Sequence, residues 1–324
     1  MEFSRRILLQ AAASACVLGS HAARAQAFPT QPIKLVVPNP PGGATDVLAR
    51  VVAEKMARSL GQAVIVENRP GAGTSIGSEF IARSPADGYA LLFAVSALTI
   101  NPSLYPNLRF DPVKDLAPIS LLGSVVHVLV VRESLPVKSV GELISFAKAN
   151  PKTLSYASVG NGTSTHLEME LLKSEAGIEM AHIPFKGSSA ALTELLAGRV
   201  DLMFDALPTS GPYIQTGKLR ALAVTASRRS SILPNVPTVA ESGLHNYDAA
   251  PWIGLLAPAG TPSAIVERLN REVNAALKVP EIAGAFSAQG VDVIGNTPQQ
   301  FSQFISADIA KWKGVVERSG AKID

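Results

Sequence analysis

The sequence predicts an α/β protein with two domains, and two observations support that prediction. From residue 33 onward the same unit recurs: a short apolar or β-branched run, a loop rich in Gly, Pro or Ser, and an amphipathic helix. This alternation is typical of α/β folds with largely parallel sheets. The pattern starts again in the middle of the chain, so we expect domain 1 in residues 26–128 and 248–324 and domain 2 in residues 129–247.

The first domain is predicted to open with three strands. Residues 33–37 form an apolar run of strand length, and residues 47–56 then place their apolar side chains on one helical face. A second strand over 63–66 leads through a Gly-rich loop into a helix over 74–83, and a third strand covers 89–94. The ends of these three strands are Gly-rich or polar, so we expect them to meet at one edge of a sheet.

The middle of the chain is interpreted as a crossing into a second domain with the same pattern. Residues 119–131 form two strand-like runs split by Gly123 and Ser124. Further strands are expected over 154–157, 181–185, 200–204 and 219–225, with helices over 164–176 and 190–197. Residues 252–257 are expected to return to the first domain. The final helix carries a core-packing stripe at helical spacing: Phe301, Phe304, Ile305, Ile309, Trp312, Val315 and Val316.

The first 25 residues are predicted to be a cleaved signal peptide. They contain the basic pair Arg5 and Arg6, an apolar stretch over 7–19, and the small-x-small sequence 23–25 before the cleavage point. The two arginines leave both a twin-arginine signal and an ordinary secretory signal open. Cys16, the one cysteine, lies inside the apolar stretch. We therefore expect a periplasmic mature chain without a thiol or a lipid anchor.

Charge and hydropathy exclude several classes of function. Removing the signal peptide takes away Arg5, Arg6, Arg24 and Glu2, which leaves 26 basic and 25 acidic residues and a net charge of about +1. This balance predicts no nucleic-acid partner. No apolar run after residue 26 reaches the roughly 18 to 20 residues that span a bilayer. The mature protein is expected to be a soluble monomer.

Two Gly-rich loops, one in each domain, are the main candidate site features. Both follow a predicted strand and precede a predicted helix, where glycine lets the backbone approach a ligand and the helix N-terminus favours an anion. Such a pair describes the two jaws of an anion cleft, with Ser96 and Asp205 at neighbouring strand ends. The candidate ligand-binding residues are Pro41, Gly42, Gly43, Ala44, Thr45, Asp46, Ser96, Ser158, Gly160, Asn161, Gly162, Thr163 and Asp205.

Several polar residues near these loops admit more than one role. Asp46 and Asp205 are each interpreted as a cap, as a residue that orients a cleft loop, or as a receiver for an ammonium group. Lys186 is either the cation of the cleft or a surface lysine. His166 lies in the first turn of a predicted helix, where a protonated imidazole would oppose the helix dipole. We expect it to be neutral and hydrogen-bonded locally.

Motifs for cofactors, metals and covalent catalysis are absent from the sequence. Gly160 and Gly162 lack the third glycine and the acidic residue of a dinucleotide site. No Gly-Lys-Ser or Gly-Lys-Thr phosphate loop and no Gly-x-Ser-x-Gly elbow occur, and the mature histidines are scattered. We expect no cofactor and no enzyme activity. A hydrolase that uses Ser158 or Ser96 with His166 is the alternative.

A family resemblance covers essentially the whole mature chain. The motifs that carry it are the Pro-Gly-Gly-x-x-Asp loop ending at Asp46, Glu67 to Gly73, Ser84 to Tyr89, Gly160 to Leu167, Phe185 to Gly187, Gly198 to Asp201, Val236 to Thr238 and Pro258 to Pro262. With these motifs the chain resembles the Bug receptors, which are the solute-binding proteins of tripartite tricarboxylate transporters.

The resemblance implies a fold, a ligand class and a partner. The fold is the type II periplasmic-binding-protein fold, with two α/β domains joined by two crossover strands around a ligand cleft. The implied function is closure over a small carboxylate and its delivery to a membrane permease, or to a sensor as a variant. The jaws would be Pro41 to Asp46 with Ser96, and Ser158 to Thr163 with Asp205. Asn39 and Pro40 stand where an aromatic or small residue is common, so a different pocket floor is expected.

Overall fold

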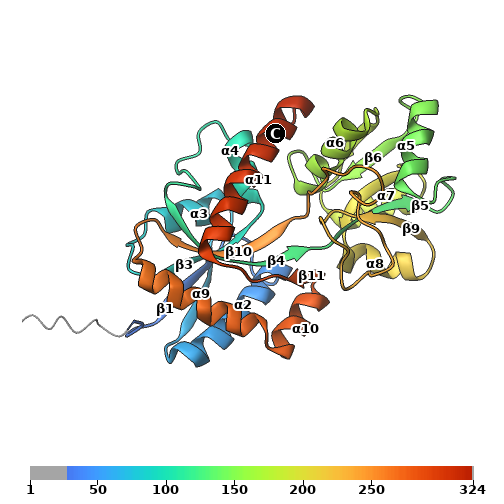
Figure 1. Ribbon diagram of the computed structural model, residues 1–324. Coiled ribbons are helices and arrows are strands. Elements are labelled where there is room, and N and C mark those ends of the chain that lie inside the picture. The colour runs from blue at the N-terminus through green and yellow to red at the C-terminus, as the bar shows by residue number, and fades with distance from the viewer. Residues whose placement is uncertain (1–27, 323–324) are drawn as a thin grey trace, which may run out of the picture.

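The computed structural model describes residues 28–322, which form two α/β lobes side by side (Figure 1). The predicted signal peptide and Cys16 lie outside the described residues. Within residues 28–322, none of the helices is both long and apolar enough to cross a membrane.

The first domain contains the N-terminal and C-terminal parts of the described chain. Its elements are β1 (Ile33–Val37), α2 (Ala44–Leu60), β2 (Val64–Asn68), the 3-10 turn η1 (Ala72–Thr74), α3 (Ser75–Ala82), β3 (Ala90–Val95), α4 (Ala97–Leu104), β4 (Leu116–Val125), β10 (Trp252–Pro258), α9 (Ser263–Leu277), α10 (Pro280–Ala288), β11 (Val291–Val293) and α11 (Pro298–Ser319). The run over residues 33–37 forms a buried strand, as predicted, with α2 packed against it.

The second domain lies between the two parts of the first. Its elements are β5 (His127–Arg132), α5 (Val140–Ala149), β6 (Ser155–Ser158), α6 (Ser164–Ala176), β7 (Ala181–Pro184), α7 (Ser188–Leu196), β8 (Leu202–Ala206), α8 (Leu207–Gln215) and β9 (Leu219–Val224). The boundary expected after residue 128 falls inside β5, and the boundary at residue 248 falls in the connection between β9 and β10.

Both sheets are mixed rather than largely parallel. Among the described strands the first sheet has the order β11-β4-β10-β3-β1-β2, and the second has the order β7-β6-β8-β5-β9. β1 pairs parallel with β2 and β3, and β6 pairs parallel with β7 and β8. β10 and β5 are antiparallel to both of their neighbours. They enter their sheets without the crossover helix that a parallel neighbour requires.

The two domains place their Gly-rich loops at equivalent positions. Without β11, the first order reads β2-β1-β3-β10-β4 and matches β7-β6-β8-β5-β9 strand for strand. The loop after β1 therefore corresponds to the loop after β6. In open α/β sheets ligands bind beyond the carboxyl ends of the strands, where the connections diverge to opposite sides. That point lies beside β1 and β3 in the first domain and beside β6 and β8 in the second.

The first crossing between the domains is a single residue, Val126. β4 continues through Gly123 to Val125, so the expected break at Gly123 and Ser124 is wrong. Gly123 serves another purpose, because a Cβ there would come within 2.6 Å of Val291 Cγ1 in the neighbouring strand β11. The strand breaks only at Val126, whose N–H donates to the Gly290 carbonyl at 2.7 Å and whose carbonyl accepts from Leu207 N at 3.0 Å.

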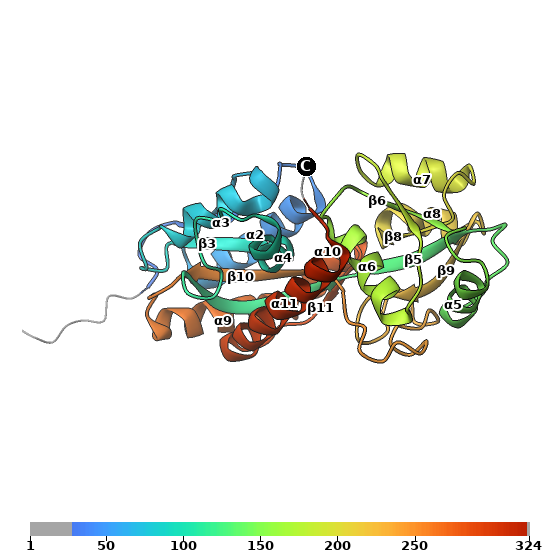
Figure 2. The ribbon, with the colours of Figure 1, turned by 90° about the horizontal axis from the view of Figure 1, so that it is seen from above.

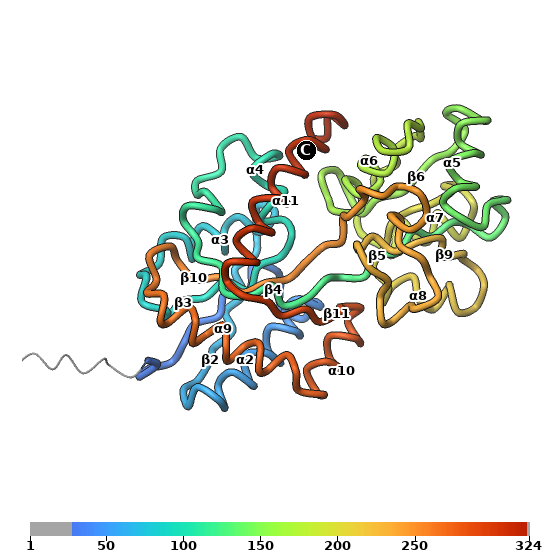
Figure 3. The backbone as a smooth tube through the Cα atoms, in the orientation of Figure 1, coloured from blue at the N-terminus to red at the C-terminus, as the bar shows by residue number. Residues whose placement is uncertain are grey.

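The second crossing runs beside the first. Figure 3 shows both passing between the lobes, one from β4 to β5 and one leading into β10. Thr225 N donates to the His127 carbonyl, and Ala249 N donates to the Thr225 carbonyl, each at 3.1 Å. The N–H of Val125 also donates to the Pro251 carbonyl at 2.7 Å. The two crossings are thus hydrogen-bonded together and form one narrow connection.

Helix α11 forms a third contact between the domains (Figure 2). Thr297 and Gln300 close its N-terminus with a capping box. Phe301 and Ile305 pack in a core cluster of the first domain. Trp312 and Val315 belong to the cluster that contains the core of the second domain. The predicted apolar stripe of the final helix is confirmed, and the second half of this stripe packs against the core of the second domain.

We predict that Gly290→Ala destabilises the protein more than Gly217→Ala does. Both glycines have a left-handed backbone, with φ of +67° and +71°, so each alanine adds about 1 kcal/mol of backbone strain. A Cβ at residue 290 would also lie 2.6 Å from Pro208 Cδ of the other domain, whereas residue 217 has no atom within 4 Å. Urea unfolding should show about 1–3 kcal/mol of additional loss for Gly290→Ala. Equal losses of unfolding free energy in the two variants would show that the contact with Pro208 does not affect stability.

Candidate functional site

A cavity of about 370 Å³ lies between the two domains at the ends of the strands. Its first-domain wall comes from the loop after β1, from η1 and from β3 and α4. Its second-domain wall comes from the loop between β6 and α6. The lining residues are Asn39, Gly73, Thr74, Val95, Ser96, Ala97, Ile100, Asn101, Leu104, Tyr105, Val159, Asn161, Gly162, Thr163 and Ser164.

The structure brings part of the predicted site to this cavity. Ser96 lines it from the first domain, and Asn161, Gly162 and Thr163 line it from the second. The other predicted residues lie outside its lining: Pro41, Gly42, Gly43, Ala44, Thr45, Asp46, Ser158, Gly160 and Asp205. Sequence reasoning missed the wall from α4, because a helix over 97–104 was not expected. The position of Ser96 directly after a strand was the one signal that pointed there.

Asp46 holds the loop after β1 in shape. Its Oδ2 accepts hydrogen bonds from the N–H of Gly42 at 2.9 Å and from Arg50 Nε at 3.0 Å, and its Oδ1 accepts from Asn68 Nδ2 at 2.9 Å. The hydrogen bond from Arg50, together with those from Gly42 and Asn68, outweighs burial and lowers the pKa of Asp46 to about 2. Of the roles considered for Asp46, the structure shows that of a residue that orients the loop.

The first-domain wall depends on close contacts between η1 and α4. Asn101 Nδ2 donates to the Gly73 carbonyl at 2.7 Å and to Ser75 Oγ at 3.1 Å. A Cβ at residue 73 would come within 2.5 Å of the Tyr105 hydroxyl, so only glycine lets Tyr105 approach so closely. These contacts fix the turn η1 against the helix that supplies the apolar residues Ile100 and Leu104.

The second-domain wall presents the N-terminus of α6. Thr163 is the N-cap residue, but its side chain does not cap the helix. Its hydroxyl donates instead to the Gly160 carbonyl at 2.7 Å. The Thr165 hydroxyl accepts from Val159 N at 3.1 Å, so the loop is folded onto itself. A helix N-terminus without a side-chain cap presents N–H groups and a positive dipole end, which favour an anion.

His166 has a local structural role, as expected from its position in the first turn. Its Nδ1 accepts a hydrogen bond from Gly162 N at 3.1 Å. Burial lowers the pKa of His166, so the imidazole is neutral. The ring stacks on His182 with centroids 3.9 Å apart, and His182 stacks in turn on Tyr156 at 4.8 Å. His166 thus connects the loop to the stacked rings.

The serine and histidine of the alternative hydrolase are not paired. Ser158 Oγ contacts Nε2 of His182 at 2.7 Å, whereas His166 accepts a hydrogen bond from the N–H of Gly162. Ser158 is completely buried, and it also donates to the Gly160 carbonyl at 3.1 Å. Burial and the neighbouring His166 lower the pKa of His182 to about 4, which makes it a weak base. The Ser158 and His182 pair therefore fixes the loop after β6.

Asp205 lies in a buried charged cluster at the end of β8. Its carboxylate accepts hydrogen bonds from the hydroxyls of Ser188 and Thr209, at the starts of α7 and α8. Nearby, His127 Nδ1 contacts both carboxylate oxygens of Glu168 at 2.9 and 3.0 Å. Burial lowers the pKa of His127, but the charge and hydrogen bond of Glu168 outweigh it and the net pKa is raised. Asp205 thus connects the first turns of α7 and α8 through hydrogen bonds.

The cavity between the domains combines hydroxyl, amide and apolar groups without any charge. None of its lining residues is acidic or basic. Lys186, considered earlier as a cleft cation, is exposed and lies outside the lining. Among residues 28–322 no group of three or more His, Cys, Asp or Glu side chains is placed to hold a metal ion. An anion here would be held by helix dipoles and hydrogen bonds.

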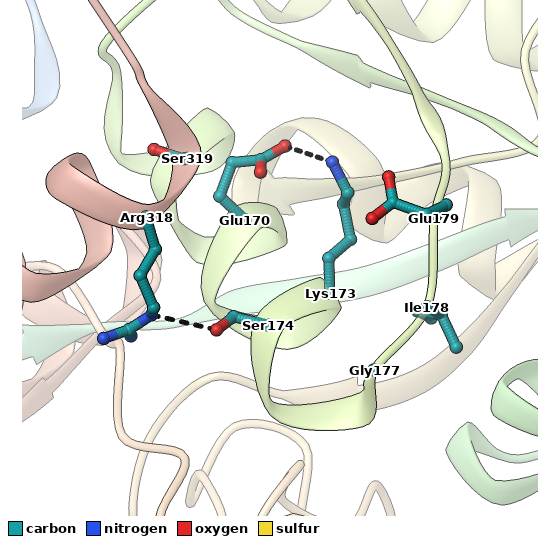
Figure 4. A pocket seen from close by; sticks show the side chains of 8 residues that line it. All are labelled: Glu170, Lys173, Ser174, Gly177, Ile178, Glu179, Arg318 and Ser319. Carbon is teal, nitrogen blue, oxygen red and sulfur yellow. Dashed lines mark hydrogen bonds and ion pairs between the residues drawn. The ribbon is translucent and has the colours of Figure 1, made fainter.

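Another cavity, of about 400 Å³, lies between α6 and the end of α11 (Figure 4). Its side chains are already paired: Lys173 Nζ lies 2.7 Å from Glu170 Oε1, and Arg318 Nε donates to Ser174 Oγ at 3.0 Å. Glu179 adds a further carboxylate to its wall. The two carboxylates offset the two cations, and the cavity lies at the C-terminal end of α6 and away from the Gly-rich loops of the two domains, so the uncharged cavity is the better candidate site.

Two α/β domains that enclose a cavity lined by loops from both define a solute-binding protein. Residues 48–321 match the family described as the Tripartite tricarboxylate transporter family receptor. The chain belongs to this family, whose members are receptors and not enzymes. The resemblance drawn from the sequence motifs is therefore confirmed, and so is the two-domain fold.

Three relatives illustrate the similarity. BugT of Bordetella pertussis is 42% identical over 301 residues, which cover 92% of this chain and 92% of that protein. A solved R. palustris protein with adipate is 36% identical, with a TM-score of 0.74, and the match covers 91% of this chain and 100% of the other. MatC from Rhodopseudomonas palustris with bound malate is 32% identical, with a TM-score of 0.70, and the match covers 89% of this chain and 100% of the other.

We predict that Asp46→Asn lowers the free energy of unfolding by about 1–3 kcal/mol at neutral pH, because hydrogen bonds to a charged carboxylate are lost. The folded pKa of about 2 lies below the ordinary value of 3.8. The stabilisation is therefore fully present above about pH 5 and is lost as the pH falls through the folded pKa of about 2. Thermal unfolding between pH 7 and pH 2 should show the two proteins converging. The exposed Asp87→Asn is the control, and a pH-independent difference would contradict the assignment.

Proposed function

We propose that this protein is a periplasmic receptor that captures a small carboxylate between its two domains and delivers it to the permease of a tripartite tricarboxylate transporter. The observation that carries the proposal is the uncharged cavity with the N-terminus of α6 on one side, where the Thr163 side chain makes no capping hydrogen bond. The family supports the transport role, and the adipate and malate held by two relatives support a carboxylate ligand.

The strength of binding requires both domains. A micromolar site needs about 8 kcal/mol. One helix terminus supplies about 0.3–1 kcal/mol, or up to about 2 in a partly buried site. Hydrogen bonds to a charged group supply about 1.5–3 kcal/mol each. Ser96 lies on one wall of the cavity and Thr163 on the other. Hydrogen bonds from both walls reach this binding free energy only if the two domains contact the ligand at the same time.

The connection at Val126 supports closure of the domains over the ligand. One residue there separates two rigid sheets, and its hydrogen bonds go one to each domain. We propose that the carboxylate lies against Ser96, Asn161, Gly162 and Thr163. Its hydrogen bonds are proposed to come from the Ser96 hydroxyl and the first-turn N–H groups of α6, because the Gly162 N–H and the Thr163 hydroxyl already donate to His166 and Gly160. In this proposal Asp46, Ser158 and Asp205 hold the loops of the two jaws in shape. The protein is proposed to act as a monomer without a cofactor.

We predict that Ser164→Phe abolishes ligand binding and leaves the fold intact. Ser164 is the first residue of α6 and lines the cavity, so an aromatic ring fills space that the ligand needs. The matched control is Ser189→Phe, in the exposed first turn of α7. Refolded protein is tested by thermal shift with succinate, malate, adipate, citrate and amino acids.

The unmodified protein and the Ser189→Phe variant should be stabilised by a carboxylate, rising to about 2.7 kcal/mol at one hundred times Kd. Ser164→Phe should show no such shift. If none of the acids stabilises the unmodified protein, the carboxylate receptor is wrong for this chain. If Ser164→Phe still responds, the ligand binds elsewhere.

A further inference from the structure

We propose that the loop before α6 contains a self-modification site, at which Asn161 loses its side-chain amide and becomes an acid, with His166 as the base. The reaction places a negative charge in the wall of the candidate cavity and so ends the capture of an anion. The modification is independent of the proposed function, whereas its effect on binding rests on that function.

The pair Asn161-Gly162 has the residue types that this reaction requires. It is the one Asn-Gly pair in the sequence. The main-chain nitrogen that follows an asparagine attacks the side-chain carbonyl carbon of that asparagine and closes a succinimide ring. Glycine has no Cβ, so no side chain obstructs the attacking nitrogen. The reacting atoms belong to neighbouring residues, which removes the cost of bringing two molecules together. Both residues are half-buried, so water reaches them.

His166 is positioned to act as the base. An amide nitrogen becomes a nucleophile when it gives up its proton, and the N–H of Gly162 donates to Nδ1 of His166 at 3.1 Å. The proton to be removed therefore already points at a basic nitrogen within hydrogen-bonding distance. Burial lowers the pKa of His166, so this nitrogen is unprotonated at neutral pH. His182, which stacks on the His166 ring at 3.9 Å, contacts Ser158 instead.

The reaction needs water as its only second reactant. The nitrogen of Gly162 forms a bond to Cγ of Asn161 while its proton passes to Nδ1 of His166. The tetrahedral carbon then expels Nδ2, which takes this proton and leaves as ammonia. Water adds to either carbonyl carbon of the succinimide and reopens the ring. Residue 161 ends as aspartate or isoaspartate, without any oxidation or reduction.

The loop holds the reacting nitrogen beside the base. The Thr163 hydroxyl donates to the Gly160 carbonyl at 2.7 Å, so the turn that contains the pair is closed. The ring of His166 is held by its stacking on His182. If the hydrogen bond from Gly162 to His166 were structural alone, it would restrain the nitrogen and slow the reaction. The two roles of His166 therefore predict opposite effects when its basic nitrogen is removed.

The product changes the charge of the cavity. Asn161 lines the cavity, and none of the lining residues is acidic or basic. A carboxylate at residue 161 lies next to the start of α6, where it competes for the favourable end of the helix dipole and repels an incoming acid. Isoaspartate also adds a methylene group to the main chain of the loop. Both products therefore oppose the binding of an anion.

The first test measures the modification without any ligand. The full mature protein is kept at neutral pH and physiological temperature, and peptide mass mapping follows the exchange of amide for acid at each asparagine. Residue 161 should convert. His166→Gln keeps an acceptor for the Gly162 N–H but removes the base, so it should slow the conversion by about 10-fold or more. His245→Gln, at an exposed position, should keep the original rate.

The melting temperature of each variant controls for folding, and His166→Asn provides a second variant. A conversion rate that stays within about 2-fold of the original in both variants would overturn the role of His166. Faster conversion in both would show that His166 protects the loop, and it would overturn the proposal as well. The proposal also fails if residue 161 stays unchanged in the folded protein while the same chain converts in guanidinium.

The second test measures the effect on binding by calorimetry with succinate, malate, adipate and citrate. For whichever acid binds the unmodified protein, Asn161→Asp should weaken the Kd by about 10-fold or more, because like charges repel. Asn161→Gln, which stays uncharged, should weaken it less. Equal Kd values for Asn161→Asp and the unmodified protein would overturn the effect on binding. If no acid binds the unmodified protein, the proposed receptor function fails, and the mass measurement still decides the modification.

Discussion

The hydrogen bonds of Val126 are the constraint on which the arrangement of the two domains depends. Its N–H is held by Gly290 of the first domain and its carbonyl by Leu207 of the second. The strands β4 and β5 lie in different sheets but are separated by this one residue. The cavity exists because the loops after β1 and β6 are carried on opposite sides of this point.

The ionisable side chains that hold the loops in shape are different from the uncharged groups that face the cavity. Asp46 and Asp205 are buried carboxylates, and each is satisfied by hydrogen bonds from its own domain. Both carboxyl groups stay out of the cavity lining, where a negative charge would repel an acid. The first-turn N–H groups of α6 and the Ser96 hydroxyl then remain for the ligand. Dipoles of this kind are fixed in place before binding, so little reorganisation is required when the acid enters.

The sequence predicted the two-domain α/β fold because its strands are continuous apolar runs with glycine or proline at their ends. The run over 33–37 and the stripe from Phe301 to Val316 folded as expected. The sequence misled at Gly123, where glycine admits the neighbouring strand β11 and does not end β4. Local patterns do not report which distant strand approaches a glycine, and this limit applies to the antiparallel positions of β5 and β10 as well.

The candidate site was predicted only in part, for a similar reason. Asn161, Gly162 and Thr163 are recognisable because glycines next to a helix start are a local signal. Tyr105 and Ile100 reach the cavity only because η1 packs against α4, a contact set by tertiary structure. The side-chain oxygen of Asn39 is buried and, among the described residues, has no hydrogen-bond donor, which is a result of tertiary packing. That information exists only in the folded molecule.

The strand order also determines when each part of the protein can form during synthesis. β4 has its two neighbours, β10 and β11, near the end of the chain, and β3 lacks one partner until β10 emerges after Trp252. The second domain, from β5 to β9, is continuous and has all its strands by Val224. Pairing between segments far apart in sequence is slow because the loop between them must close first. The newly made chain therefore carries all the strands of the second sheet beside a first sheet with open edges, and it is in this interval that a chaperone would find exposed strands to bind.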